Sequence, residues 1–267
     1  MEPDKNNNNE SNIEEKDSFR DIVKRTFSLH EDVATHEEIK DRLLAGGRIT
    51  GTNMLVMLCA IMIASIGLNT GSTAVIIGAM LISPIMGTIL ATAFCVESAN
   101  LFLARRHLLG FAMQIVISVG ASTIFFLISP VKEPTTELIA RTDPSFFDVL
   151  IATFGGIAGI IGQTRSDKVT NIIPGVAIAT ALMPPLCTCG YSIANGNWHM
   201  LSGAAYLFLI NAYFIFLSSS VILSILKIPK THDISDSRWK RLRRYMAIAT
   251  IIIVIPSIYF IIQIAIG

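Results

Sequence analysis

The chain has 267 residues, of which 52% are hydrophobic and only 15% are charged, and its mean hydropathy is +0.58. This composition excludes an ordinary soluble domain, while the net charge of +1 says little because the charges are strongly segregated. The apolar residues come in runs of roughly 17 to 23, the length that crosses a bilayer core about 30 Å thick. We therefore expect an all-α, polytopic membrane protein.

Residues 1–50 form a polar N-terminal tail in which no cleavable signal peptide is visible. Its first part is rich in asparagine and of low complexity, which predicts disorder. Between Phe19 and Phe27, apolar residues at helical spacing predict an amphipathic helix that lies on the membrane surface. A second short helix is expected to begin after Thr35, which forms a capping box with Glu38, and to end at Gly46-Gly47.

About seven transmembrane helices are expected after this tail. They cover residues 52–68, 73–96, 108–129, 147–163, 171–194, 201–226 and 245–266. Lysine and arginine concentrate before the first, third, fifth and seventh of these helices, whereas the intervening loops hold only Lys132 and Arg141. This positive-inside pattern predicts a cytoplasmic N-terminus, an outer C-terminus and a location in the cytoplasmic (inner) membrane.

Two stretches of the chain, Ile66–Gly87 and Ile161–Leu186, resemble each other. Each closes one helix with Ile-Gly, makes a short polar turn, enters the next helix through Ile-Ile and reaches proline near the middle of the membrane. Because three is an odd number of crossings, residues 51–130 and 131–228 would form a 3+3 inverted repeat. Residues 229–267, a basic loop and one extra helix, lie outside it.

Two motifs stand at matching places in these repeats, GAMLISPIMG (Gly78–Gly87) and PGVAIATALMPPL (Pro174–Leu186). They resemble the paired signatures of a prokaryotic integral-membrane family, domain of unknown function 389, and the similarity covers roughly Arg42 to Leu226. The resemblance implies a cytoplasmic-membrane protein whose two motifs form its core, and it implies no particular chemistry.

Pro84 in the second span and the Pro184-Pro185 pair in the fifth predict two broken helices. A proline cannot donate to the carbonyl four residues earlier, and carbonyls freed in this way suit cations, whereas freed N–H groups suit anions. The candidate site for an ion or small polar solute comprises Met80, Ser83, Pro84, Gly87, Thr88, Thr180, Ala181, Pro184, Pro185, Cys187 and Thr188. The alternative is a pair of packing kinks, because neighbouring helices often satisfy the backbone around a membrane proline.

Polar side chains are scarce within the spans, so each is a candidate for gating or coupling. Glu97 and Asn100 lie at the inner end of the second span, where Glu97 could equally be an interfacial carboxylate neutralised by Arg105 or Arg106. Gln114 and Asn211 occupy the third and sixth spans, and they either line a pathway or form hydrogen bonds between helices.

Three further features have a plain explanation each. Cys187 and Cys189 would project about 200° apart on a regular helix, which favours small buried residues over a soft-metal site, so we expect no metal and no cofactor. The basic stretch Arg238–Tyr245 lies against a span, which favours anionic membrane lipids over nucleic acid. The small face at Gly155 and Gly159 permits close helix packing, either within the chain or in a homo-oligomer.

The leading hypothesis is a transporter or channel-like permease for an ion or small polar solute, which binds where the second and fifth spans cross. The alternative is a non-transporting membrane protein, such as a sensor, a scaffold or a lipid-binding protein. We do not expect an enzyme, because the sequence contains no phosphate loop, no zinc-protease motif and no catalytic triad constellation.

Overall fold

The computed structural model describes residues 33–166 and 173–230, together with residues 244, 248, 251 and 252, and for residues 173–180 it describes the backbone alone. The predicted surface helix at Phe19–Phe27, the basic stretch Arg238–Tyr245 and most of the predicted span 245–266 lie outside the described residues.

The elements of the described residues are all helices. In chain order they are α2 (His36–Gly46), α3 (Gly51–Asn69), α4 (Thr73–Ile82), α5 (Ile85–Glu97), α6 (Leu101–Ile128), α7 (Thr136–Ile139), α8 (Phe146–Thr164), α9 (Ile173–Ala194) and α10 (Trp198–Ile225). Within the described residues α3, α6, α8 and α10 are long and apolar enough to cross a membrane, and the bent pair of α4 and α5 makes a fifth candidate. The chain is therefore an all-helical protein of the multi-pass membrane type, whereas seven spans and the inverted repeat stay predictions.

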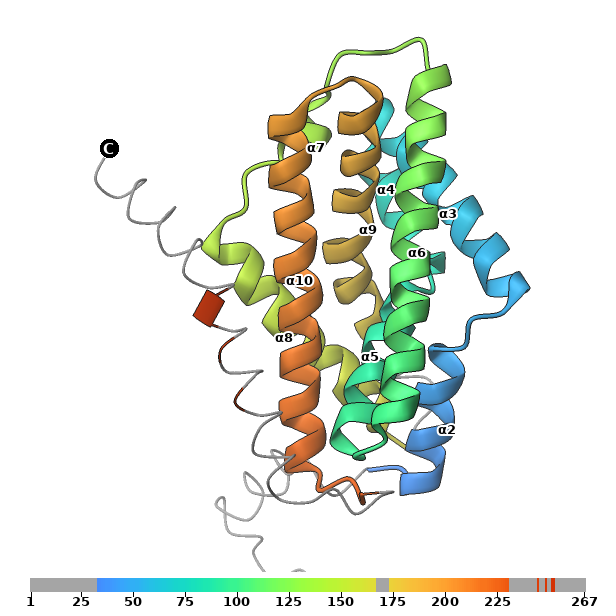
Figure 1. The fold of residues 1–267 in the computed structure, drawn as a ribbon, viewed down its shortest axis with the longest axis vertical. Helices are drawn as coiled ribbons and strands as arrows, with labels where there is room; N and C mark the ends of the chain where they lie inside the picture. The colour runs from blue at the N-terminus through green and yellow to red at the C-terminus, as the bar shows by residue number, and fades with distance from the viewer. Residues whose placement is uncertain (1–32, 167–172, 231–243, 245–247, 249–250, 253–267) are drawn as a thin grey trace, which may run out of the picture. The chain divides into compact units, whose positions relative to one another are not determined.

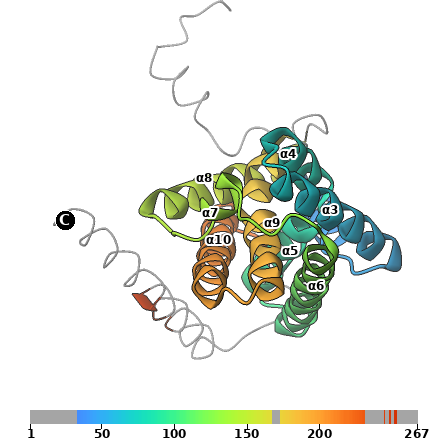
Figure 2. The ribbon, with the colours of Figure 1, turned by 90° about the horizontal axis from the view of Figure 1, so that it is seen from above.

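Helix α9 is the centre of the described fold. It packs against α3, α4, α5, α6, α8 and α10, and Figures 1 and 2 show it with these helices around it. Every residue from Ala181 to Ser192 is buried, as expected for a helix enclosed on all sides. A tight turn joins α9 to α10 through Gly196, whose φ of +68° suits glycine. We call the side of this turn outer and the side of α2 inner, following the predicted orientation.

The two proline sites differ. The expected break at Pro84 is present, because α4 ends at Ile82, α5 begins at Ile85 and the two helices meet at 46°. The expected break at Pro184-Pro185 is wrong, because α9 runs through both prolines as one helix. The reason lies in the neighbours of α9, which supply hydrogen bonds near the prolines, as described below.

The helix boundaries follow the capping residues more closely than the apolar runs. The capping box of Thr35 and Glu38 is confirmed at the start of α2. Helix α6 begins seven residues before the expected 108, because Asn100 accepts a hydrogen bond from the Leu103 N–H at 3.1 Å and caps the helix. Arg105 and Arg106 therefore lie within α6 and not in a loop.

Helix α8 has four buried glycines, and one of them serves packing within the chain. Gly155, Gly159 and Gly162 are buried, and so is Gly156, where an added Cβ would lie 2.1 Å from Ser218 Oγ and 2.9 Å from Ile215 Cα of α10. Ser219 Oγ also donates to the Gly156 carbonyl at 3.3 Å. The close approach of α8 and α10 thus explains Gly156, whereas a homo-oligomer contact at the other glycines stays a prediction.

Candidate functional site

The break between α4 and α5 is built from Ser83 and Pro84. Ser83 is extended, with φ −76° and ψ 127°, as expected for a residue before proline, and Pro84 starts the next helix with φ −81° and ψ 0°. The Met80 carbonyl, to which Pro84 cannot donate, accepts instead from the Ser83 N–H at 3.3 Å. Helix α5 begins without a hydrogen bond from a capping side chain, so the break leaves a polar helix end inside the apolar part of the fold.

The inner side of this break is covered by α2. An added Cβ on Gly87, one turn into α5, would lie 2.2 Å from the Gly46 carbonyl oxygen at the end of α2. The next residue, Gly47, offers its carbonyl to His107 Nδ1 of α6 at 3.1 Å. Arg42 of α2 donates to the carbonyl of Arg165. Gly87 therefore allows α2 to approach α5, and α2 joins the two halves of the chain on their inner side.

Five buried side-chain oxygens have no hydrogen-bond partner within the described residues. Asn69 Oδ1 at the end of α3 and Ser220 Oγ near the end of α10 lie toward the two ends of the fold, and the other three lie nearer its middle. They are Ser83 Oγ at the break, Gln114 Oε1 on α6 and Asn211 Oδ1 on α10. Gln114 is 1% exposed and Asn211 is 3% exposed, and Thr88 of α5 is buried as well. A buried oxygen without a donor costs about 1–3 kcal/mol, so these atoms favour water, an ion or a polar solute beside them.

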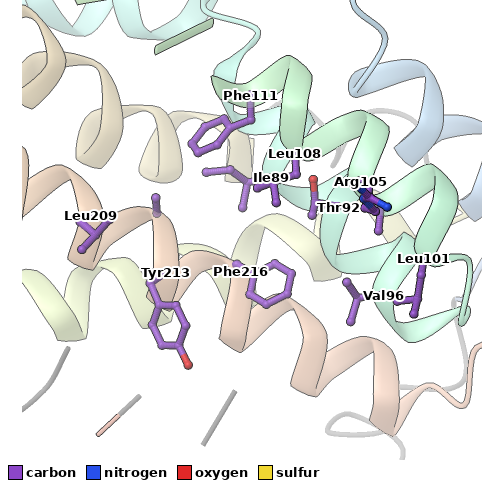
Figure 3. Close-up of a pocket in the computed structure, with 12 residues that line it drawn as sticks. Ile89, Thr92, Val96, Leu101, Arg105, Leu108, Phe111, Leu209, Tyr213 and Phe216 are labelled. Carbon is purple, nitrogen blue, oxygen red and sulfur yellow. The ribbon is translucent and has the colours of Figure 1, made fainter. Parts of the chain in front are cut away.

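The positions of these oxygens along the fold follow from a contact between α6 and α10. The rings of Phe111 and Phe208 stack with their centroids 5.9 Å apart, and Ile89 of α5 borders the same groove as Phe111 (Figure 3). Gln114 is about one turn to the outer side of this ring pair, and Asn211 is about one turn to its inner side. Since Ser83 lies between one and two turns outward from Ile89, the three oxygens fall within a few turns of the α4–α5 break.

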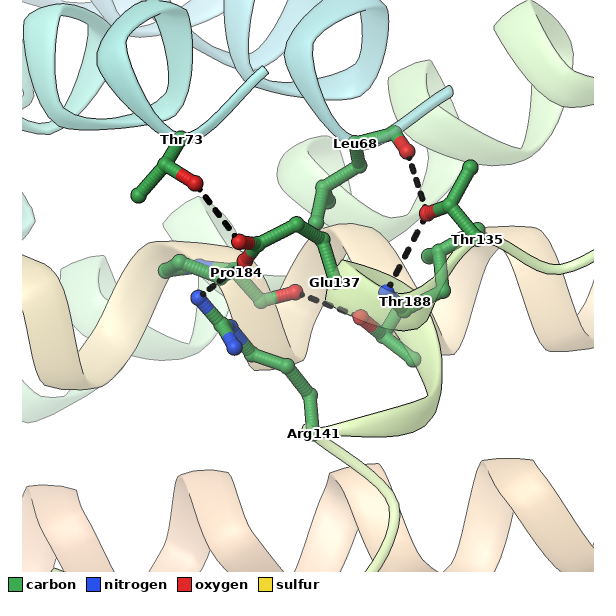
Figure 4. Close-up of polar contacts among 8 residues, drawn as sticks. Leu68, Thr73, Thr135, Glu137, Arg141, Pro184 and Thr188 are labelled. Carbon is green, nitrogen blue, oxygen red and sulfur yellow. Dashed lines mark hydrogen bonds and ion pairs between the residues drawn. The ribbon is translucent and has the colours of Figure 1, made fainter. Parts of the chain in front are cut away.

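The double proline of α9 is supported by side chains. Asn211 Nδ2 donates to the Ala181 carbonyl, which Pro185 leaves free, at 2.8 Å. Thr188 Oγ1 donates to the Pro184 carbonyl at 2.9 Å (Figure 4). Ser122 Oγ of α6 donates to the Cys187 carbonyl at 3.0 Å. Groups that the sequence marked as ligands of a solute are thus used to hold α9 in its place, and the side chain of Thr180 lies outside the described residues.

Some of the residues predicted for gating or coupling are likewise used to hold helices in place. Asn100 caps α6, and Glu97 is the half-buried last residue of α5. Asn211 forms the hydrogen bond between helices that was its alternative role, and its remaining oxygen stays available. Gln114 belongs to a polar row on α6 that continues through Ser118 and Ser122, both buried. The four-residue spacing of this row is visible in the sequence, although only Gln114 was singled out from it.

The outer side holds a polar cluster that sequence reasoning missed. Glu137 of α7 accepts from Thr73 Oγ1 at the start of α4 at 2.7 Å and from Arg141 Nη2 at 3.0 Å (Figure 4). Thr135 Oγ1 donates to the Leu68 carbonyl at the end of α3 at 2.6 Å. The loop before α8 therefore clamps the α3–α4 turn. Its partners are more than 60 residues apart, so no local pattern reveals them.

The segments of the chain that match known proteins include α9 and most of the helices around it. The model of a family described as a domain of unknown function (DUF389) matches residues 80–217. The chain belongs to the DUF389 family. It is also 29% identical over 187 residues to an uncharacterised protein of Methanocaldococcus jannaschii, in a match that covers 70% of this chain and 56% of that relative. The chain thus spans little more than half of the relative's length, and no solved structure matches.

The DUF389 match has a clear relation to the candidate site. The segment 80–217 begins just before the α4–α5 break and includes Gln114, the double proline and Asn211. It leaves out α2, which covers the inner side of the break, and α3, which packs against α4. The family resemblance expected from the two motifs is confirmed at the level of the family.

Proposed function

We propose that this DUF389 protein carries or conducts an ion or small polar solute across the membrane, and that the solute passes the break between α4 and α5. The observation that carries the proposal is a helix interrupted within the apolar fold, with three buried oxygens that lack partners among the described residues within a few helical turns of the break along the fold. A membrane protein that had only to pack would gain stability from apolar side chains in the same places.

The proposed solute contacts are Ser83, Gln114 and Asn211, with Thr88 and the helix ends at Pro84 close by. The orphan atoms are amide and hydroxyl oxygens without formal charge, which suits a monovalent cation or a neutral solute that donates hydrogen bonds. Such a site binds weakly, as a pathway requires if the solute is to leave again. Helix α9 contributes the fixed wall, because the carbonyl of Ala181, which Pro185 leaves free, accepts a hydrogen bond from Asn211.

Access to the break would be controlled from two sides. The clamp of Glu137, Thr73 and Thr135 closes the outer side over the α3–α4 turn, and α2 covers the inner side at Gly87. The bend of 46° gives α4 and α5 the freedom to move separately, which a straight helix would not have. Alternating access would then consist of opening the outer clamp while α2 stays in place, or of moving α2 while the outer clamp stays closed.

Flux through reconstituted vesicles tests the proposal. The full chain would be placed in vesicles and challenged in turn with gradients of K⁺, Na⁺, NH₄⁺ and urea, and each flux compared with that of empty vesicles. Gln114→Leu removes one orphan oxygen and should reduce the flux about five- to thirtyfold, because a pathway loses a polar contact worth about 1–2 kcal/mol. Met113→Leu changes the neighbouring side chain, which is 59% exposed, and should leave the flux unchanged.

A non-transporting membrane role is the second candidate. It is favoured by the hydrogen bond from Asn211 that supports α9 and by the place of an apolar groove, which lies on the outside of α5, α6 and α10 and not at Pro84. If no solute of the panel passes, and if Gln114→Leu raises the melting temperature without any other effect, the non-transporting role is the better account.

A further inference from the structure

The outside of the fold carries an apolar groove of about 530 Å³ between α5, α6 and α10. Its lining includes Ile89 and Val96 from α5, Leu108 and Phe111 from α6, and Phe216 from α10 (Figure 3). The walls are open to the surroundings of the protein, since Leu108 is 57% exposed. Its volume falls in the range of roughly 300–1,000 Å³ that is typical of small-molecule sites.

The groove has a closed end and a charged end. Phe111, Ile89 and Leu209 form the end toward the middle of the membrane, where the Phe111 ring stacks on Phe208. Leu101 and Arg105 lie at the opposite end, on the predicted cytoplasmic side. The eleven residues of α6 from Leu101 to Phe111 extend over about 15 Å. This is half of a hydrocarbon core of about 30 Å, so the groove is as deep as one leaflet.

Among the described residues that line this groove, Arg105 is the only charged one. Its side chain is exposed, and within the described part of the chain no hydrogen bond or ion pair engages it. A cation at the water-facing end of an apolar channel one leaflet deep matches the chemistry of a phospholipid with a negative headgroup. Zwitterionic lipids offer the same acyl chain with a weaker attraction for the guanidinium.

We propose that this groove binds one anionic phospholipid of the inner leaflet, with an acyl chain along Leu108 and Phe216 and its phosphate at Arg105. The site is separate from the α4–α5 break and does not depend on the proposed transport. The lipid would fill the groove beside α5, which packs against both α6 and α10, and would hold α6 and α10 at a fixed distance.

Native mass spectrometry of the full chain tests this site. The protein would be titrated with phosphatidylglycerol and, separately, with phosphatidylcholine of the same acyl chains. Wild type should retain one phosphatidylglycerol in preference to phosphatidylcholine. Arg105→Gln should lower the apparent affinity for phosphatidylglycerol by about fivefold, the effect of one arginine beside an anionic headgroup. Arg106→Gln, the matched change at the next exposed position, should leave it within about twofold of wild type.

A second variant tests the groove itself. Ala212→Trp places a large ring in the lining and should abolish retention of both lipids while the protein still elutes as a folded particle. Equal losses in Arg105→Gln and Arg106→Gln would mean diffuse attraction to basic residues and would overturn the proposal. Unchanged phosphatidylglycerol binding in all three variants would also overturn the proposal. This result is expected if the chain's own final predicted helix or a second copy filled the groove, because the lipid would then bind elsewhere.

Discussion

The two proline sites of this protein show that neighbouring helices determine whether a proline interrupts a membrane helix. A single proline divides α4 from α5 at an angle of 46°, whereas two adjacent prolines leave α9 unbroken. Ala181 beside the double proline receives a hydrogen bond from Asn211, and its surroundings are buried on every side. Ser83 at the single proline keeps an unpartnered hydroxyl, and on α4 Leu81 is 52% exposed.

The comparison teaches that a proline interrupts a helix where no neighbour compensates for it. Neighbouring helices that enclose α9 offer hydroxyls and an amide to its backbone, and their packing limits how far it can bend. Helix α4 packs on α3 and α9 and exposes its other face, so it can diverge from α5. The following predictions test this difference, starting from the largest expected effect.

The enclosure of α9 predicts a large penalty for filling Gly190. An added Cβ there would lie 2.5 Å from Ser122 Cβ and 2.8 Å from the Thr123 backbone nitrogen of α6. Gly190→Val should lower the free energy of unfolding by about 3 kcal/mol or more, because α6 and α9 must separate. Unfolding by denaturant in detergent micelles measures this loss.

Gly78 on α4 provides the matched control. An added Cβ on Gly78 meets nothing within 4 Å, so Gly78→Val should change the free energy of unfolding by less than about 1 kcal/mol. Similar losses at Gly78 and Gly190 would show that the two helices are enclosed to the same degree, which contradicts the comparison.

Removing the amide that supports the double proline should have a moderate effect. Asn211→Leu leaves the Ala181 carbonyl without its donor, and it also removes the unpartnered Oδ1, which offsets part of the loss. We expect a net destabilisation of about 1–2 kcal/mol, seen as a lower midpoint of unfolding. Ser202→Ala, which deletes an exposed hydroxyl of the same helix, should have no measurable effect. Equal midpoints for the two variants would mean that Asn211 does not support α9.

The sequence was sufficient for those features that depend on nearby residues. The capping box of Thr35 and Glu38, the helix at 51–69 and the break at Pro84 all follow from contacts within a few positions. The start of α6 at Leu101 also depends on a nearby residue, because Asn100 is a strong cap and fixes the start of the helix before the apolar run begins.

The continuity of α9 was beyond such reasoning. Its support comes from Asn211, which lies 30 residues after the carbonyl that it caps, and from Ser122, 65 residues before Cys187. The outer clamp joins Thr73 to Glu137 across 64 residues. The sequence could name Asn211 and Gln114 as polar residues within spans, but only the packing of helices assigns one of them to a particular carbonyl.

The most direct test of the account compares the two proline sites in one flux measurement. Pro84→Ala and the double change of Pro184 and Pro185 to alanine would each be reconstituted in vesicles and measured with whichever solute of the panel the wild type passes. The account predicts that Pro84→Ala loses most of the flux, because α4 and α5 can join into one helix, and that the double variant keeps it. Full flux in Pro84→Ala together with loss in the double variant would contradict it.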